Sequence, residues 1–199
     1  MEPLLDIKGL DCGLVRDVNL RIGAGEIACL SGASGSGKSR LLRAIADLDP
    51  NRGRLTIAGD DRESMPAHAW RRRVGYFPAE SQWWHERVGE HFAQPEDEAL
   101  AALGFDHDVM RWEIARLSSG ERARLALIRL WSHRPQALLL DEPTANLDPA
   151  SAAAVERWLA SVAHQERALL WVSHDRAQIE RVADHAFDLR EGRLWTSSR

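Results

Sequence analysis

Apolar residues occur along the chain in short runs and in periodic stretches, and the two patterns predict different elements. The short runs predict early strands at Leu4–Lys8, Val15–Ile22, Ile27–Leu30, Arg54–Ala58 and Val74–Phe77. Elements then alternate as helix Ser119–Trp131, strand Ala137–Leu140, helix Pro149–Ala163, strand Ala168–Val172 and helix Ala177–Val182. The alternation predicts an α/β core with a largely parallel central sheet, and we expect the early strands to add an N-terminal antiparallel β portion. A closing hairpin is predicted at Ala186–Leu189 and Arg193–Trp195.

A region from about residue 81 to 116 lacks strand patterning. Two stretches in it have helical period, at Glu96–Leu103 and Asp108–Leu117. We therefore expect one domain over residues 1–199, with a small helical subdomain at about 81–134 inserted in the α/β core.

Composition narrows the class of protein. Of the 199 residues, 44% are hydrophobic, yet no apolar run exceeds five residues, whereas a membrane span needs about 20. The acidic N-terminus has no signal-peptide pattern, and Cys12 and Cys29 are too few for a disulfide framework. We expect a cytoplasmic protein. Its net charge of −4 argues against nucleic acid as the main partner.

The most specific motif is Gly-Ala-Ser-Gly-Ser-Gly-Lys-Ser at residues 32–39, between an apolar strand and a helical stretch. Glycines let backbone N–H groups converge on phosphate oxygens, and the helix N-terminus favours the negative charge. Lys38 is one of only two lysines among 26 basic residues; it is expected to reach the β- and γ-phosphates of a nucleoside triphosphate, while Ser39 binds Mg²⁺. The predicted nucleotide-binding residues are Gly32, Ala33, Ser34, Gly35, Ser36, Gly37, Lys38, Ser39 and Arg40.

A second group of candidate residues follows the strand at 137–140, where Asp141 and Glu142 come directly after four apolar residues. Carboxylates at the C-terminal end of a buried strand lie at the ligand-binding edge of an α/β sheet. We expect Asp141 to hold Mg²⁺, and Glu142 to orient or deprotonate the water that attacks the γ-phosphate.

Together with residues 117–121, Leu-Ser-Ser-Gly-Glu, these motifs give the whole chain a resemblance to the ATP-binding cassette (ABC) family, whose signature is Leu-Ser-Gly-Gly-Gln. Residues 145–148 resemble the family's D-loop, and His174 resembles the switch histidine that contacts the γ-phosphate. The resemblance implies a P-loop NTPase fold and a head-to-tail dimer with ATP in the interface. The signature residues that would close over the ATP of the second copy are Ser118, Ser119, Gly120 and Glu121.

Three departures from the family pattern affect the expected binding site. No aromatic residue precedes Trp70, so the usual stacking on adenine is absent; Leu10, Cys12 or Leu14 supplies apolar contact only. Base stacking is worth about 1–3 kcal/mol, so we expect weaker ATP binding and poor discrimination of adenine.

The second departure is Ala79, which stands where the family has a glutamine that contacts Mg²⁺ and water, with Glu80 and Gln82 as alternative donors. The third is in the signature, where Ser119 replaces glycine and Glu121 replaces glutamine. Glu121 adds negative charge near a phosphate site unless it points away or pairs with a neighbouring arginine.

The resemblance implies an ATPase that drives solute transport through a separate membrane permease, on the cytoplasmic face of the inner membrane. Trp83 and Trp84 are candidate anchors for the permease, or else they pack inside the helical insertion. One alternative is a soluble, non-transport ABC ATPase that acts on nucleic acid or the ribosome. Another is a small-molecule kinase, against which the Ser118 segment and Glu142-Pro143-Thr144 argue.

Overall fold

Two sheets organise the computed structural model, which describes residues 2–92, 94 and 96–197. The six-stranded central sheet has the order β10-β9-β3-β8-β7-β6, in which every pair is parallel except β9 with β10. Its strands are β3 Ile27–Ser31, β6 Val74–Phe77, β7 Ala137–Asp141, β8 Ala168–Val172, β9 His185–Arg190 and β10 Arg193–Thr196. The predicted largely parallel sheet and closing hairpin are confirmed.

The central strands are buried on both faces, which explains their unbroken apolar runs. Within β7, Leu138 and Leu140 belong to one core cluster, whereas Ala137 and Leu139 belong to the other. Successive strand residues point to opposite faces, so the sheet separates two cores. One core includes the helices at residues 119–131 and 149–163, and the other includes the second sheet together with the helices at 38–45 and 67–73.

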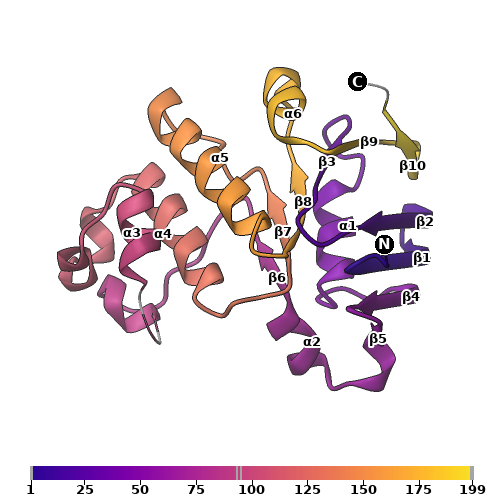
Figure 1. Ribbon diagram of the computed structural model, residues 1–199, viewed down its shortest axis with the longest axis horizontal. Helices are drawn as coiled ribbons and strands as arrows, with labels where there is room; N and C mark the ends of the chain where they lie inside the picture. Colours follow the sequence, from indigo (N-terminus) through magenta and orange to yellow (C-terminus); the bar gives the residue numbers. More distant parts are fainter. Residues whose placement is uncertain (1, 93, 95, 198–199) are drawn as a thin grey trace.

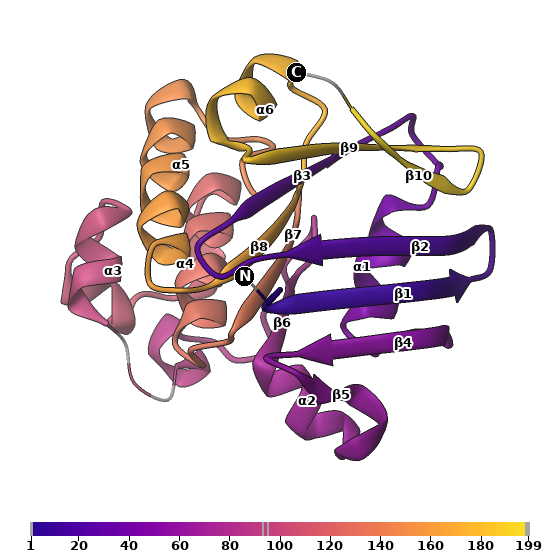
Figure 2. The same ribbon diagram turned by 45° about the vertical axis from the view of Figure 1, so that its right-hand side comes forward.

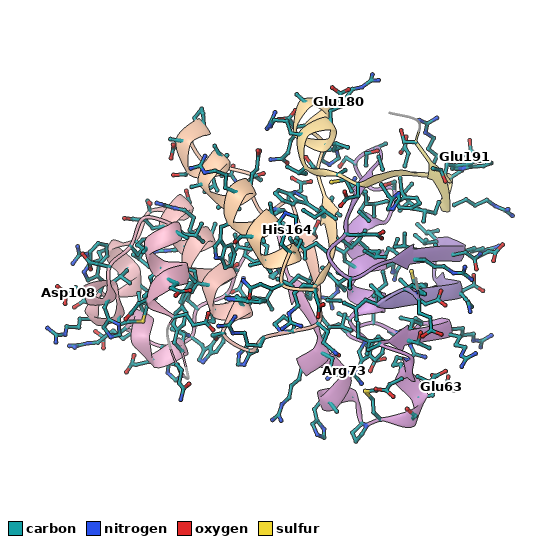
Figure 3. All side chains as sticks on the ribbon, viewed as in Figure 1. Glu63, Arg73, Asp108, His164, Glu180 and Glu191 are labelled. Atoms are coloured by element: carbon teal, nitrogen blue, oxygen red, sulfur yellow. The ribbon has the colours of Figure 1, made fainter. Side chains whose placement is uncertain are left out.

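The second sheet is antiparallel, with the order β2-β1-β4-β5, and it lies on the opposite side of the molecule from α3 and α4 (Figure 1). Its strands are β1 Leu5–Cys12, β2 Val15–Ile22, β4 Arg52–Ile57 and β5 Asp60–Asp61. Arg73, labelled in Figure 3, ties the two sheets together. Its guanidinium donates to Gln136 Oε1 at 2.6 Å, to Asp60 Oδ2 at 2.8 Å and to the Ile57 carbonyl at 3.1 Å.

Six α-helices are described: α1 Lys38–Ile45, α2 Ala67–Arg73, α3 Asp97–Ala102, α4 Ser119–Trp131, α5 Pro149–Ala163 and α6 Arg176–Val182. Figure 2 shows α4 and α5 beside the central strands, with α1 on the side of the antiparallel sheet. Across the described residues, no helix has the length and apolar character needed to cross a membrane.

One predicted helix is wrong. Residues 108–117 do not form a single helix; they form two 3-10 helices, His107–Arg111 and Ile114–Arg116, separated by extended backbone at Trp112. The cause is a pairing with a distant segment. The Ile114 N–H donates to the Glu86 carbonyl at 2.8 Å, and the Val88 N–H donates to the Trp112 carbonyl at 3.0 Å.

Helical elements lie between β6 and β7, in agreement with an insertion at this point of the chain. That the insertion forms a separate subdomain at about 81–134 stays a prediction. Five positions of the expected 1–199 domain lie outside the described residues, namely 1, 93, 95, 198 and 199.

Candidate functional site

The loop between β3 and α1 has a backbone that only glycine tolerates. Gly32, Gly35 and Gly37 have φ values of 142°, 76° and 104°, in the region that side chains disfavour. A Cβ on Gly32 would lie 2.6 Å from the Leu189 carbonyl oxygen, and one on Gly37 would lie 2.7 Å from Val15 Cγ2. The predicted bend of the glycine loop is therefore present, and Gly37 precedes the first residue of α1.

Lys38 lies inside this loop with only 7% of its surface exposed. Its ammonium donates to the carbonyl oxygens of Gly32 at 2.8 Å and Ala33 at 3.0 Å. Burial lowers the pKa of Lys38, while the carboxylates of Glu142 and Asp141 act in the opposite direction. A buried ammonium near carboxylates, inside a glycine loop, is suited to the phosphates and metal of a nucleoside triphosphate.

Two serines add hydroxyl groups to the loop. Ser36 Oγ is buried and has no hydrogen-bond partner among the described residues. Ser39 is exposed on the first turn of α1. A buried polar atom without a partner is costly, and a phosphate oxygen would satisfy it. The loop's donor set thus fits the predicted triphosphate, and Ser39 fits a hydroxyl ligand of Mg²⁺.

Asp141 is the last residue of β7, where it is buried. The Tyr76 hydroxyl donates to Asp141 Oδ2 at 3.3 Å. Burial, followed by the Asp141 charge, raises the pKa of Tyr76 to about 12, so the phenol stays protonated. Tyr76 was not among the predicted site residues, because the parallel pairing of β6 with β7, which brings the two side chains together, is a tertiary feature.

Glu142 follows in a strained conformation. Its φ of 51° is left-handed, which costs a non-glycine residue about 1–3 kcal/mol and is typical of functional positions. Glu142 Oε1 lies 3.0 Å from His174 Nε2, and both side chains are partly exposed. The structure therefore brings together the predicted base and the predicted switch histidine from the ends of neighbouring strands.

A buried glutamine supports this pair. Gln178 on α6 accepts a hydrogen bond from Ser173 Oγ at 2.8 Å and donates to Thr144 Oγ1 and Glu156 Oε1, both at 2.9 Å. These bonds tie the residue before His174 to the segment after Glu142. Sequence reasoning missed Gln178, because its partners Thr144 and Glu156 lie 34 and 22 residues away along the chain.

Ser118 caps α4, and although the residue is exposed, its amide and hydroxyl groups bond within the cap. The Ser118 N–H and Oγ–H each donate to Glu121 Oε2 at 2.8 Å, and the Glu121 N–H donates to Ser118 Oγ at 3.2 Å. This is a reciprocal capping box, and these bonds lower the pKa of Glu121. The Glu121 charge is thus held by the N-terminus of its own helix.

Neither arginine beside the signature forms the pair considered for Glu121. Arg122 donates to the Ile114 carbonyl at 3.0 Å, and Arg124 donates to the Leu103 carbonyl at 2.7 Å. The two guanidinium groups therefore connect α4 to the preceding segments that contain Leu103 and Ile114.

Two cavities border parts of the predicted site, although Lys38, Ser39 and Asp141 line neither of them. One, of about 730 Å³, is lined by Gly32, Ala33 and His174; the other, of about 530 Å³, is lined by Glu142 and His174. Lys38 interacts electrostatically with Glu142 and Asp141, and His174 lies beside Glu142. One copy of the chain thus brings together the phosphate loop, the acidic strand end and His174. Within the described residues, no hydrogen bond or ion pair joins the segment 118–121 to these groups.

Glu80 and Gln82, the alternatives to the missing glutamine, are both exposed. The Gln82 carbonyl accepts a hydrogen bond from Arg129 at 3.0 Å. No side-chain bond within the described residues directs either one toward Asp141, so their role stays a prediction.

Comparison with known proteins agrees with this geometry. The profile of the ABC transporter family matches residues 15–145. The chain is 29% identical to the probable iron export ATP-binding protein FetA of Escherichia coli (strain K12), over 96% of each chain. It is 32% identical to the lipoprotein-releasing system ATP-binding protein LolD 2 of Caulobacter vibrioides, over 97% of each chain. A solved ATP-binding subunit of an ABC transporter superposes with a TM-score of 0.88 at 23% identity, over 98% of this chain and 90% of that one.

Proposed function

The chain belongs to the ABC transporter family, and from that premise we propose that it is an ATP-hydrolysing subunit that works as a head-to-tail homodimer with a separate membrane permease. One observation carries the proposal. The buried Lys38 ammonium lies in a glycine loop beside the carboxylates of Asp141 and Glu142. This combination suits phosphoryl transfer to water, in which positioning and electrostatics supply most of the catalysis.

Each residue has a separate task in this reaction. The loop N–H groups, Ser36 and Lys38 bind the phosphates, and Glu142 accepts a proton from the attacking water. His174, 3.0 Å from the Glu142 carboxylate, orients that carboxylate and contacts the γ-phosphate. Mg²⁺, which Ser39 and Asp141 would hold, supplies positive charge that neutralises the phosphate oxygens.

The position of the signature segment supports the homodimer. Within the described residues of one copy, no hydrogen bond or ion pair joins residues 118–121 to the phosphate loop, Glu142 or His174, so a second copy would bring its own signature segment to the ATP. A Cβ on Gly120 would lie 3.3 Å from Leu147 Cδ2, so the signature of one copy packs beside its own D-loop. Both segments would then form parts of one dimer surface.

A site completed by a second copy makes the activity depend on protein concentration. We expect phosphate release from Mg²⁺-ATP, per mole of chain, to rise with chain concentration and to level off once dimers dominate. Light scattering with and without ATP measures the dimer fraction over the same range. A specific activity that stays constant while the chain remains monomeric would contradict the shared site.

We place the permease contact around Trp84, which is 65% exposed, whereas Trp83 is partly buried against the core. The Arg129 guanidinium lies over both indole rings, 4.3 Å from the Trp83 centroid and 4.9 Å from that of Trp84. Burial lowers the pKa of Arg129, and its Nη1 has no partner among the described residues. The exposed Trp84 indole and the buried Arg129 donor without a partner are together typical of an interface anchor.

Two single substitutions separate the interface role from a packing role. We expect Trp84→Ala to reduce association with membrane vesicles that contain the permease by about 10-fold or more, with stability within about 0.5 kcal/mol of the wild type. Trp83→Ala should instead lower the free energy of unfolding by about 1–3 kcal/mol. Urea unfolding and vesicle sedimentation measure the two effects. Loss of stability without selective loss of association in Trp84→Ala would contradict the assignment.

A further inference from the structure

The base of a bound nucleotide has no aromatic platform upstream of the phosphate loop. The first aromatic residue, Trp70, is fully buried, and its Nε1 donates to the Ile45 carbonyl at 2.8 Å. Of the apolar residues considered as substitutes, Leu10 and Cys12 are buried and unavailable to a ligand. Leu14, in the turn between β1 and β2, is 72% exposed. The face of the base is therefore open to contact by another group.

Arg40 reaches the same turn from the phosphate loop. It is exposed on the first turn of α1, directly after Ser39. A Cβ on Gly13 would lie 2.9 Å from Arg40 Nη1 and 3.1 Å from Cζ, so the guanidinium packs against the backbone of this glycine. Gly13 has a φ of 75°, so the turn itself favours glycine there. Within the described residues, the Arg40 side chain forms no hydrogen bond or ion pair.

The turn that carries Leu14 is held in place by contacts with the β9–β10 turn, which belongs to the other sheet. The Arg16 N–H donates to the Gly192 carbonyl at 2.8 Å, which joins the start of β2 to the β9–β10 turn. Figure 3 shows Glu191 of that second turn at the end of the molecule opposite Asp108. Gly192 is needed for this contact, because a Cβ on it would lie 2.1 Å from the Leu14 carbonyl oxygen. Leu14 and the Arg40 guanidinium thus share a braced surface beside the phosphate loop.

We infer that Arg40 binds the base of the nucleotide, with its planar guanidinium stacked on the ring and Leu14 in apolar contact with it; the inference rests on the proposed ATP-binding function. A guanidinium stacks on aromatic faces and attracts their negative quadrupole. Every base has an aromatic face, so this contact stabilises the binding of any base and does not distinguish one base from another. ATP and GTP should therefore bind with similar affinity.

The test compares ligands that share the phosphates but differ in the base. Arg40→Ala is expected to weaken ATP and GTP binding by about 2- to 30-fold, and to leave binding of inorganic tripolyphosphate unchanged within about 2-fold. Arg40→Lys, which keeps the charge but not the plane, should recover only part of the loss. Calorimetric titration gives the three dissociation constants. An equal loss for tripolyphosphate would overturn the inference, because Arg40 would then bind phosphate, and so would unchanged ATP affinity.

Two control variants complete the experiment. Arg16→Ala removes a guanidinium from the same turn region and should leave all three affinities unchanged. Trp195→Ala removes an aromatic side chain, 58% exposed, from the neighbouring hairpin. A selective loss of ATP and GTP binding in Trp195→Ala, with none in Arg40→Ala, would overturn the inference. If the unmodified chain bound neither ATP nor tripolyphosphate, the proposed function itself would fail, and the inference with it.

Discussion

Replacement of Glu142 by glutamine is expected to lower ATP turnover by about 10²- to 10⁴-fold while leaving ATP binding intact. The amide has nearly the same shape as the carboxylate but cannot accept the proton of the attacking water. Because ATP then persists in the site, the ATP-bound dimer should accumulate. Phosphate release measures the turnover, and gel filtration with light scattering in the presence of ATP measures the dimer.

Glu166 offers a matched control for this substitution. It is also a left-handed glutamate, with a φ of 60° against 51° for Glu142, but it lies in the exposed turn after α5. Glu166→Gln should therefore reproduce any backbone effect and none of the catalytic effect. Normal turnover in Glu142→Gln would show that another group is the base.

Loss of the Lys38 ammonium is expected to weaken ATP binding by about 10- to 150-fold, which corresponds to about 1.5–3 kcal/mol for a charge-assisted hydrogen bond. The same ammonium also bonds to the carbonyls of Gly32 and Ala33. Lys38→Ala should thus also speed hydrogen exchange at the loop amides. Calorimetry with Mg²⁺-ATP and exchange mass spectrometry measure the two effects.

The chain's other lysine provides the control for Lys38. Lys8 is half exposed on β1 and pairs with Asp6 at 3.0 Å, so its loss removes only a surface ion pair. Lys8→Ala should leave ATP affinity unchanged. Equal affinity for ATP in Lys38→Ala and the wild type would remove the central support for the proposed function.

Local patterns predicted the elements of the α/β core well. The strands at 15–22, 74–77 and 168–172 and the helices at 119–131 and 149–163 have the predicted bounds. Their patterns are clear because β6 and β8 are buried on both faces, which gives unbroken apolar runs, whereas β2 and the helices bury one face, which gives periodic apolar positions. The phosphate loop was equally predictable, since its shape depends on glycines within eight consecutive residues.

Other features depended on residues far apart in the chain. The stretch 108–117 has helical period, yet its pairing with Glu86 and Val88 holds Trp112 extended. The Gln178 network likewise depends on how α5 and α6 pack together. Such contacts leave no signal in a short stretch of sequence, because a backbone N–H or a buried side-chain amide forms a hydrogen bond with whichever partner the fold brings near.

Sequence alone determined the α/β class, the glycine loop with its lysine, the acids at the end of β7 and the likeness to one family, since each is written in a local spacing of residue types. Only the tertiary structure decided that Tyr76 holds Asp141 and that Arg40 lies against Gly13. Parallel strand pairing and the packing of turns bring these side chains together. A side chain bonds to the groups that lie near it in space, even when they are far away along the chain.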